Sequence, residues 1–451
     1  MKEGIYLTSR QRFLVKALSA TFGCLAAMPV LADSEIEALK RELAEQKQLI
    51  GKLLAAQESQ KQINAKMEAQ TVAKAPPAAE TSPSGISVYG VADVNVSSMN
   101  SGAGHKVSFG SGGLSSSRIG VKGERGLGGD LKVVGLAEAG ILLDTGSTGN
   151  ASVVPGINNS AASSGGQLGT GSQLFSRQVY AGLASGRFGS VTIGRQYAGS
   201  YLAAAVTGNA MGVGFYGYSG SILPLVGMPT RVNNSMVYQT PSFYGLTGYL
   251  TYTTGSENNV VSDTVVSGTT KTNDKAGQGY DLALFFKHGP FNAALTGWNI
   301  YNASYESAGE IGLARKTGWQ VAANYDFGVV KLHATAVGGK ISGGNYESVT
   351  KSLSKSTGWS VSAAVPIGSH RIYTSYTSFN DRSPLNKDAK LWGLGYSYDL
   401  YANTKLYASW GKMLNSQNAK YSLADGGNLV GNVITSGFDP EGYMAGLNYS
   451  F

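Results

Sequence analysis

The residues best suited to do chemistry in this chain are arginines that lack acidic neighbours in the sequence. The stretch 145–256 contains no Asp or Glu but holds Arg177, Arg187, Arg195 and Arg231. A guanidinium group binds a carboxylate or phosphate through two parallel hydrogen bonds, and rings of Arg or Lys make a narrow passage favour anions. The pattern therefore predicts a site that attracts small anions.

The overall charge agrees with this prediction only modestly. The chain carries 36 Lys and Arg against 28 Asp and Glu, a formal net charge of +8 at pH 7. An alternative interpretation is that carboxylates far away in the sequence compensate the arginines and leave the preference weak. The candidates for this compensation are Asp93, Glu138 and Asp281.

The sequence does not indicate catalysis. None of the four histidines lies in a Gly-x-Ser-x-Gly, His-x-x-x-His or similar motif. Ser369 and His370 are adjacent, but neighbours on a turn do not by themselves form a nucleophile–base pair. The single cysteine, Cys24, lies in the predicted leader described below. We therefore expect no enzyme activity, no cofactor, no metal and no nucleic-acid partner.

Residues 1–32 have the pattern of a secretory signal peptide. Basic residues precede an apolar stretch at 17–28, and residues 30–32 form a small-residue cleavage site. The apolar stretch is too short to span a bilayer. The mature chain is therefore expected outside the cytoplasm and without cysteine.

Period-two alternation predicts β-strands from residue 86 onward. In 443–451 the odd positions are apolar or aromatic and the even ones mostly small or polar, so each set faces one side of a strand. No segment after the leader reaches the roughly 18 apolar residues of a transmembrane helix. If the chain enters a membrane, it must do so as a closed barrel, because lipid tolerates no unpaired backbone groups.

The alternation recurs in sixteen segments. They are 86–99, 115–125, 130–142, 172–184, 187–197, 231–241, 245–254, 279–288, 290–302, 316–327, 328–340, 356–366, 368–380, 389–400, 402–413 and 442–451. Short turns alternate with long Gly/Ser/Asn-rich connections, which is typical of outer-membrane barrels. The predicted fold is all-β, a 16-stranded antiparallel transmembrane β-barrel preceded by an N-terminal α-helical coiled coil. A barrel of this size encloses an aqueous channel; a soluble β-sandwich is the alternative.

Residues 33–74 follow a heptad pattern instead. Apolar a and d positions give way to polar ones along the segment, which predicts a coiled coil that weakens toward its C-terminal end. The predicted core residues are Ile36, Leu39, Leu43, Ile50 and Leu53. Apolar flanking positions favour three or more helices, and a solitary solvated helix is the alternative. A Pro/Ala/Ser-rich linker, 75–85, leads to the predicted barrel, 86–451.

Three segments of the predicted barrel carry a family resemblance. They are SRIGVKGE at 117–124, SRQVYAGL at 176–183 and FGSVTIGRQY at 188–197. Together with the terminal YSF at 449–451, they resemble the trimeric general porins of Gram-negative bacteria, most closely the β-proteobacterial type. The resemblance implies a homotrimer and a third loop folded into the lumen. The coiled coil lies outside the common pattern and resembles the periplasmic extension of certain dicarboxylate-channel porins.

In that family a basic cluster on the barrel wall faces carboxylates on the third loop. The resemblance implies that this wall cluster is Arg118, Arg195 and Arg231, and alternation adds Lys122 to the predicted pore constriction. Alternation turns Arg118, Lys122 and Arg231 inward. Arg195, by contrast, would face lipid unless its strand bulges or ends near Gly194, and Arg177 meets the same difficulty.

The expected third loop, 198–230, departs from the family because it contains no Asp or Glu. Toward the wall it offers the constriction-loop residues Asn209, Phe215, Tyr216, Tyr218 and Ser219. Later strands add secondary inward-facing basic residues, namely Lys331, His333, Arg371 and Lys405. A basic wall without opposing carboxylates leaves a positive potential at the narrowest point, and narrow clefts amplify such fields.

These patterns predict an outer-membrane porin through which small hydrophilic solutes diffuse, with a preference for anions such as dicarboxylates. The expected partners are two further copies of the chain, outer-membrane lipid and lipopolysaccharide, and small anionic solutes. The coiled coil is expected in the periplasm, with peptidoglycan as a further candidate partner. The competing hypothesis is a structural or adhesive outer-membrane barrel with a plugged lumen.

Overall fold

The computed structural model describes residues 85–148, 174–255, 277–305, 311–342, 355–423 and 433–451. The chain divides into two units, Met1–Ala78 and Ala79–Phe451, and every described residue belongs to the second. The predicted signal peptide and coiled coil, with its core residues Ile36, Leu39, Leu43, Ile50 and Leu53, lie outside the described residues. So does the predicted linker, except for its last residue.

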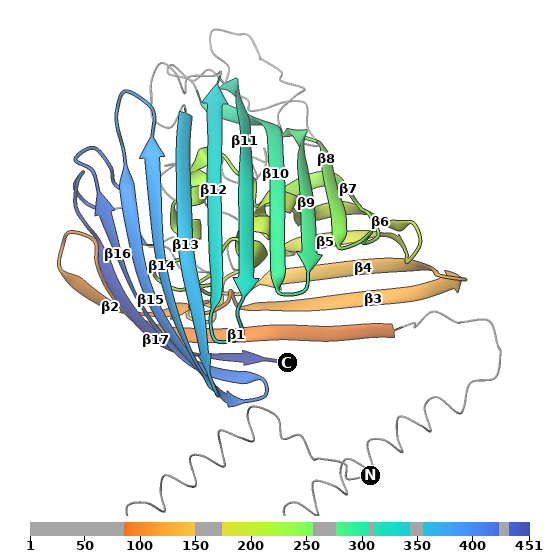
Figure 1. The fold of residues 1–451 in the computed structure, drawn as a ribbon, viewed down its shortest axis with the longest axis horizontal. Helices are drawn as coiled ribbons and strands as arrows, with labels where there is room; N and C mark the ends of the chain where they lie inside the picture. Colours follow the sequence, from red (N-terminus) through yellow and green to blue (C-terminus); the bar gives the residue numbers. More distant parts are fainter. Residues whose placement is uncertain (1–84, 149–173, 256–276, 306–310, 343–354, 424–432) are drawn as a thin grey trace, which may run out of the picture. The chain divides into compact units, whose positions relative to one another are not determined.

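The described residues form a closed antiparallel barrel (Figure 1). Its strands are β1 (Gly85–Asn100), β2 (His105–Ser111), β3 (Arg118–Gly128), β4 (Leu131–Gly140), β5 (Gln178–Ser185), β6 (Gly189–Tyr197), β7 (Arg231–Gln239), β8 (Leu246–Thr254), β9 (Gln278–His288), β10 (Phe291–Tyr305), β11 (Ile311–Asp326), β12 (Lys331–Ser342), β13 (Lys355–Ile367), β14 (His370–Asp381), β15 (Ala389–Tyr401), β16 (Thr404–Asn415) and β17 (Glu441–Ser450). From β3 to β17 each strand pairs with the next. The ring closes because β1 pairs with β17 on one edge and with β3 on the other.

The predicted number of barrel strands is confirmed, although the structure contains an additional short strand. Along one edge of β1, residues 85–91 pair with β3 and residues 94–100 pair with β2. β2 and β3 are therefore two halves of one barrel strand, interrupted at residues 112–117. When β2 and β3 are counted as one, the seventeen described strands make sixteen barrel strands around the ring. β2 was not predicted from the sequence because it is only seven residues long and is flanked by Gly and Ser.

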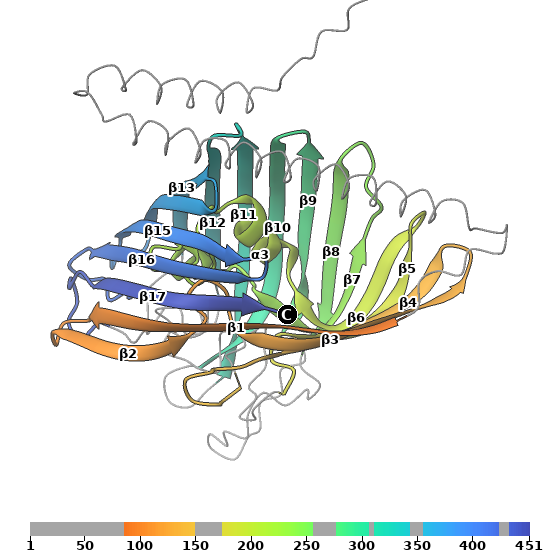
Figure 2. The same cartoon turned by 90° about the horizontal axis from the view of Figure 1, so that it is seen from below.

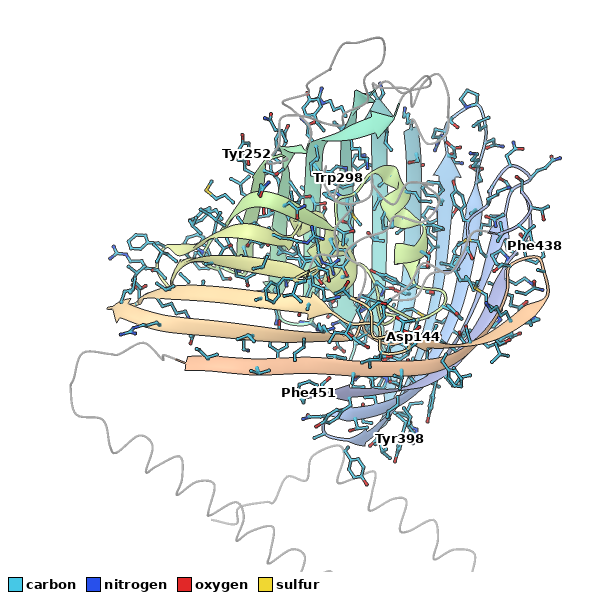
Figure 3. The ribbon with its side chains drawn as sticks, turned by 180° about the vertical axis from the view of Figure 1, so that it is seen from behind. Asp144, Tyr252, Trp298, Tyr398, Phe438 and Phe451 are labelled. Carbon is cyan, nitrogen blue, oxygen red and sulfur yellow. The ribbon has the colours of Figure 1, made fainter. Side chains whose placement is uncertain are left out.

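The two faces of the barrel wall follow the predicted alternation. Trp319, Trp392 and Tyr443 are each nearly half exposed on the outer face, whereas Gln320 on the inner face is fully buried. The chain ends at Phe451, which is exposed beside β1 (Figure 3) and exchanges two backbone hydrogen bonds with Gly90. An apolar outer face with aromatic side chains suits a barrel surrounded by lipid.

The segment between β6 and β7 folds inside the barrel, as Figure 2 shows for α3. We call this segment, residues 198–230, the inner loop. It contains α3 (Gly199–Leu202), the π-helix η2 (Ala203–Thr207) and the short 3-10 helices η3 (Ser219–Ser221) and η4 (Leu223–Val226). Among the described residues, no helix is long and apolar enough to cross a membrane.

Polar contacts attach the inner loop to one side of the wall. The Thr207 carbonyl accepts a hydrogen bond from Asn324 Nδ2 at 3.0 Å and lies 2.9 Å from His333 Nδ1. Further along the loop, the Ala210 amide donates to Ser362 Oγ and the Gly217 carbonyl accepts from Ser375 Oγ. The backbone groups of an otherwise irregular segment thus find partners on β11 to β14.

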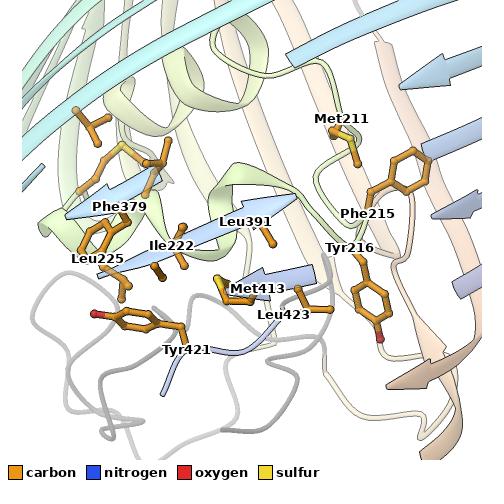
Figure 4. Close-up of a cluster of buried hydrophobic side chains, with 14 of the residues drawn as sticks. Met211, Phe215, Tyr216, Ile222, Leu225, Phe379, Leu391, Met413, Tyr421 and Leu423 are labelled. Atoms are coloured by element: carbon orange, nitrogen blue, oxygen red, sulfur yellow. The ribbon is translucent and has the colours of Figure 1, made fainter. Parts of the chain in front are cut away.

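An apolar core reinforces this attachment (Figure 4). Phe215, Ile222 and Leu225 of the inner loop pack in one buried cluster with Phe379 and Leu391 of the wall, and all five are at most 1% exposed. Burying each such side chain contributes about 1.5–3 kcal/mol. The loop is therefore a packed part of the barrel interior.

Wall glycines make this close packing feasible. A Cβ at Gly217, which has a φ of +91°, would lie 2.2 Å from the Cα of Gly393 on β15. Loop backbone and strand backbone are thus in direct contact, which neither position would allow with a larger residue. This accounts for part of the high glycine content of the chain.

Candidate functional site

Three arginines converge on one carboxylate and one tyrosine at the start of the inner loop. The Nε of Arg177 lies 2.7 Å from Oε1 of Glu138, and the Nε of Arg118 lies 3.4 Å from Oε2. Arg177 and Arg231 both donate to the hydroxyl of Tyr197, at 2.6 and 2.7 Å. The Arg231 guanidinium also lies over the Tyr197 ring, 4.5 Å from its centroid, an attractive cation–π contact.

Arg195 joins this cluster through an irregularity in its strand. The register between β6 and β7 shifts between Gly194 and Gln196, and Gly194 has a φ of +141°. Arg195 is buried, and its guanidinium donates to the Ser176 carbonyl and to Oδ1 of Asn233. The register shift at Gly194 breaks the strict alternation of the strand, so that Arg195 does not face lipid.

Gly194 is required at this position for steric reasons. A Cβ there would lie 2.1 Å from the Val179 carbonyl oxygen, a distance that real side chains do not adopt. Its φ also falls in a region that L-residues rarely occupy. The glycine thus permits the register shift that turns Arg195 away from lipid.

The charge of the cluster remains positive. Four guanidinium groups, those of Arg118, Arg177, Arg195 and Arg231, accompany the single carboxylate of Glu138 within the described part of this site. One negative charge against four leaves a formal net charge of +3. Glu138 is separated from Arg118 and Arg177 in the sequence but contacts both of them. It therefore compensates the positive charge of the arginines only in part.

The other two candidate carboxylates do not contact the arginines. Asp93 is fully buried and hydrogen-bonds to residues 112–117, the segment between β2 and β3. We call this segment the inward turn. Its two oxygens accept hydrogen bonds from the backbone amides of residues 113, 114 and 115. Asp281 instead accepts from the Ser200 amide at the base of the inner loop. Both carboxylates therefore hold backbone segments in place.

The inward turn also positions Arg118. Nη1 of Arg118 donates to Ser115 Oγ at 3.0 Å and to the Ser116 carbonyl at 2.8 Å. With its side chain 24% exposed, Arg118 is more accessible than Arg177, at 11%, and than Arg195 and Arg231, which are at most 6% exposed as whole residues. Arg118 is thus the cluster member that a solute in the lumen can reach most readily.

The remaining predicted basic residues lie apart from this cluster. Lys122 is exposed, with its Nζ 5.8 Å from the Tyr89 ring centroid. His333 is buried against the Thr207 carbonyl, and Lys405 forms an ion pair with Asp399. Arg371 is exposed near the turn between β13 and β14, and Lys331 lines a cavity described below. They do not form one site.

The predicted constriction-loop residues are mostly covered. Asn209, Phe215, Tyr216, Tyr218 and Ser219 are all at most 8% exposed. Phe215 and Tyr216 belong to the apolar core, and burial raises the pKa of Tyr218 well above its usual value. In this structure these side chains anchor the inner loop, because they pack against the wall and leave little surface to water.

Three residues of the site were not assigned to it from the sequence. Glu138 was considered only as a distant charge, Arg177 was doubted because of its phase, and Tyr197 was not considered. A buried Lys316 on β11, beside Gly227 of the inner loop, was also missed. Only the SRQVY and GRQY motifs pointed to Arg177 and Tyr197.

Comparison with known families identifies the fold. A family model for Gram-negative porins matches residues 69–418. The chain belongs to that family. The recognition from the three sequence motifs is thereby confirmed, and with it the assignment to porins of the Gram-negative outer membrane.

Individual relatives of this porin agree. It is 26% identical over 381 residues to outer membrane porin protein 32 of Delftia acidovorans, covering 82% of this chain and 94% of the relative. It is 28% identical over 318 residues to an outer membrane porin protein of Bordetella pertussis, covering 65% of this chain and 75% of the relative. These relatives are porins and not enzymes.

A solved structure supports the same fold. The anion-selective porin from Comamonas acidovorans superposes with a TM-score of 0.62 at 20% identity, covering 82% of this porin and 100% of that chain. At this identity the likeness supports the barrel fold alone. Within the described residues, no group of three or more His, Cys, Asp or Glu could hold a metal ion.

Proposed function

We propose that the protein is a passive channel of the outer membrane that conducts small hydrophilic solutes and prefers anions. The observation that carries the proposal is the arginine cluster inside a closed barrel, next to the inner loop, whose four positive charges are compensated only in part by Glu138. Positive charge lining a narrow aqueous passage lowers the energy of an anion there and raises that of a cation. The similar porin from Comamonas acidovorans is itself described as anion-selective, which is in keeping with this proposal.

Dicarboxylates are the sharper form of the proposal. Arg118 is partly accessible, and Arg177, Arg195 and Arg231 are more buried. Arginine suits this role because its planar fork can bind a carboxylate through two hydrogen bonds. A solute with two carboxylates would gain from several guanidinium groups at once, whereas a monovalent anion would engage fewer. Arg195 and Arg231 are proposed as constriction residues on the same basis, and Lys122, which is exposed on β3 apart from the cluster, is proposed as a further one for its charge.

The test is a planar-bilayer recording of the mature protein under a KCl gradient. We expect stepwise channels with a reversal potential that indicates anion preference, and current reduction by succinate at concentrations where acetate has little effect. A cation-selective potential would contradict the anion proposal. Well-folded protein without conductance would instead favour the competing hypothesis of a plugged structural barrel, for which the filled inner-loop core is the motivating observation.

We further propose that the channel is a homotrimer and that residues 33–74 form a periplasmic coiled coil that strengthens it. The heptad pattern motivates this, since apolar flanking positions favour three helices. Deleting 33–74 should leave single-channel conductance unchanged and lower the temperature at which trimers dissociate in detergent by several degrees. The measurement is gel mobility after heating. Trimers of unchanged heat resistance would contradict the proposed role. The same deletion also tests whether residues 33–74 bind peptidoglycan, because the shortened protein should then no longer be retained on it.

A further inference from the structure

A second site lies in the lumen on the short-turn side of the inner loop. A cavity of about 660 Å³ opens between η2 and the ends of β7 to β12. This volume falls in the range of small-molecule sites. The residues that matter below are Val206 of the inner loop, Phe285 and Lys287 of β9, Asn292 of β10, Asn324 of β11 and Lys331 of β12. The cavity does not include the arginine cluster.

The polar side of this cavity favours a negative charge. Lys287 and Lys331 line it together with a single acidic residue, Asp326, whose Oδ1 accepts the amide of Gly328 in its own turn at 2.9 Å. Neither lysine forms an ion pair with a described residue. Asn292 donates to Asn324 at 2.8 Å, and Asn324 donates to the Thr207 carbonyl, so the amides are held in place.

The apolar side is unusual for a water-filled channel. Val206 is 68% exposed although it lies on the inner loop, inside the barrel. Phe285 lines the same cavity and packs against the alanine cluster Ala203, Ala294 and Ala322. An exposed valine beside an aromatic ring gives no advantage to an inorganic ion, but it can bury the apolar part of an organic solute.

A second cavity, of about 440 Å³, serves as an internal comparison. It is lined by Lys122, Glu124 and Tyr180 on the other side of the lumen. Its lining holds one lysine and one carboxylate, and Glu124 also forms an ion pair with Lys132 at 2.6 Å, whereas the first cavity holds two lysines and one carboxylate. Neither an exposed valine nor two unpaired lysines occur among its described lining residues. The first cavity therefore has the stronger combination of charge and apolar surface.

We propose that the cavity beneath η2 is a binding subsite for organic monoanions that carry an apolar group, such as aromatic or branched-chain carboxylates. The carboxylate lies toward Lys287 and Lys331, and the apolar part contacts Val206 and Phe285. The subsite rests on the proposed channel function for its role in transport, but binding at the cavity does not require conduction. It adds a selection by apolar character to the selection by charge at the arginine cluster.

The experiment compares benzoate with acetate by current-noise analysis on single channels of the mature protein. We expect benzoate to bind measurably more tightly than acetate. Val206→Ser should weaken benzoate binding about fivefold and leave acetate unchanged, while Val206→Leu should strengthen it. Lys331→Gln should weaken benzoate about threefold. The matched control is Arg371→Gln, an exposed basic residue near another short turn and not in the cavity lining.

Two results would overturn the subsite. One is benzoate binding that is equal in wild type, Val206→Ser and Val206→Leu. The other is an equal loss in Arg371→Gln and Lys331→Gln, which would indicate only general charge in the lumen. If the wild type does not conduct, the channel proposal fails on its own. Calorimetric titration of benzoate into the detergent-folded protein then decides the subsite separately, using the same variants.

Discussion

Replacing Arg118 and Arg231 with glutamate should reverse the ion preference of the channel. The described cluster then contains two guanidinium groups and three carboxylates, so its formal net charge changes from +3 to −1. At about 10 Å in water each charge unit alters the energy of a passing ion by about 0.4 kcal/mol, and more where the passage excludes water. Four units together correspond to a change of at least about tenfold in the permeability ratio.

The measurement is the reversal potential under a KCl gradient, which should change sign. Arg231 is buried, so the milder pair Arg118→Gln and Arg231→Gln is recorded alongside and should give an intermediate potential. The matched control is Arg187→Glu with Arg382→Glu, which changes the chain by the same charge at two exposed positions outside the cluster. A potential that stays anion-selective in the glutamate pair, or moves equally in the control, would show that these arginines do not set selectivity.

Asp93→Ala should be among the most destabilising single substitutions in the barrel. Its carboxylate accepts three backbone amides of the inward turn, the Tyr407 hydroxyl at 2.5 Å and Asn448 Nδ2 at 2.7 Å. Without it, the three backbone amides and Asn448 Nδ2 lose this acceptor at a buried or partly buried place, and each buried donor left unpaired costs about 1–3 kcal/mol. Allowing for water entering the site, we expect a loss of about 3–5 kcal/mol.

Thermal unfolding of the detergent-folded protein measures this effect, and Asp93→Ala should unfold at a clearly lower temperature. Asp144→Ala is the control, because it removes the same group from an exposed loop position (Figure 3). Since the inward turn also holds Arg118, we expect weaker anion selectivity in any Asp93→Ala channel that does insert. An unfolding midpoint equal to that of Asp144→Ala would mean that the carboxylate does not hold the turn.

The sequence predicted the barrel well because each strand carries its own evidence. Alternation in segments such as 316–327 and 389–400 depends only on neighbouring residues and on which face meets lipid. The one strand that was missed, β2, is too short for the pattern to be distinctive. The interruption between β2 and β3 is bound by Asp93, whose other partners Tyr407 and Asn448 are more than 300 residues away.

The site was less predictable, for a physical reason. Alternation along a strand assigns each side chain to one face of the wall, but a register shift reverses that assignment. The shift at Gly194 goes with a glycine backbone conformation that the alternation does not indicate. Counting charges likewise found the acid-free stretch but not the contact of Glu138 with Arg118 and Arg177. Whether loop residues such as Phe215 meet water or the wall depends on tertiary packing, so composition could not decide it.

Asp93 also links the position of Arg118, a residue of the proposed selectivity site, to the completion of the barrel. It lies on the first strand, whereas the hydroxyl and amide that complete its coordination come from the last two strands, β16 and β17. Until those strands arrive, the turn that orients Arg118 lacks its full support. In the proposed anion channel, the pairing of the first and last strands that closes the wall therefore also completes the support of the turn that orients Arg118.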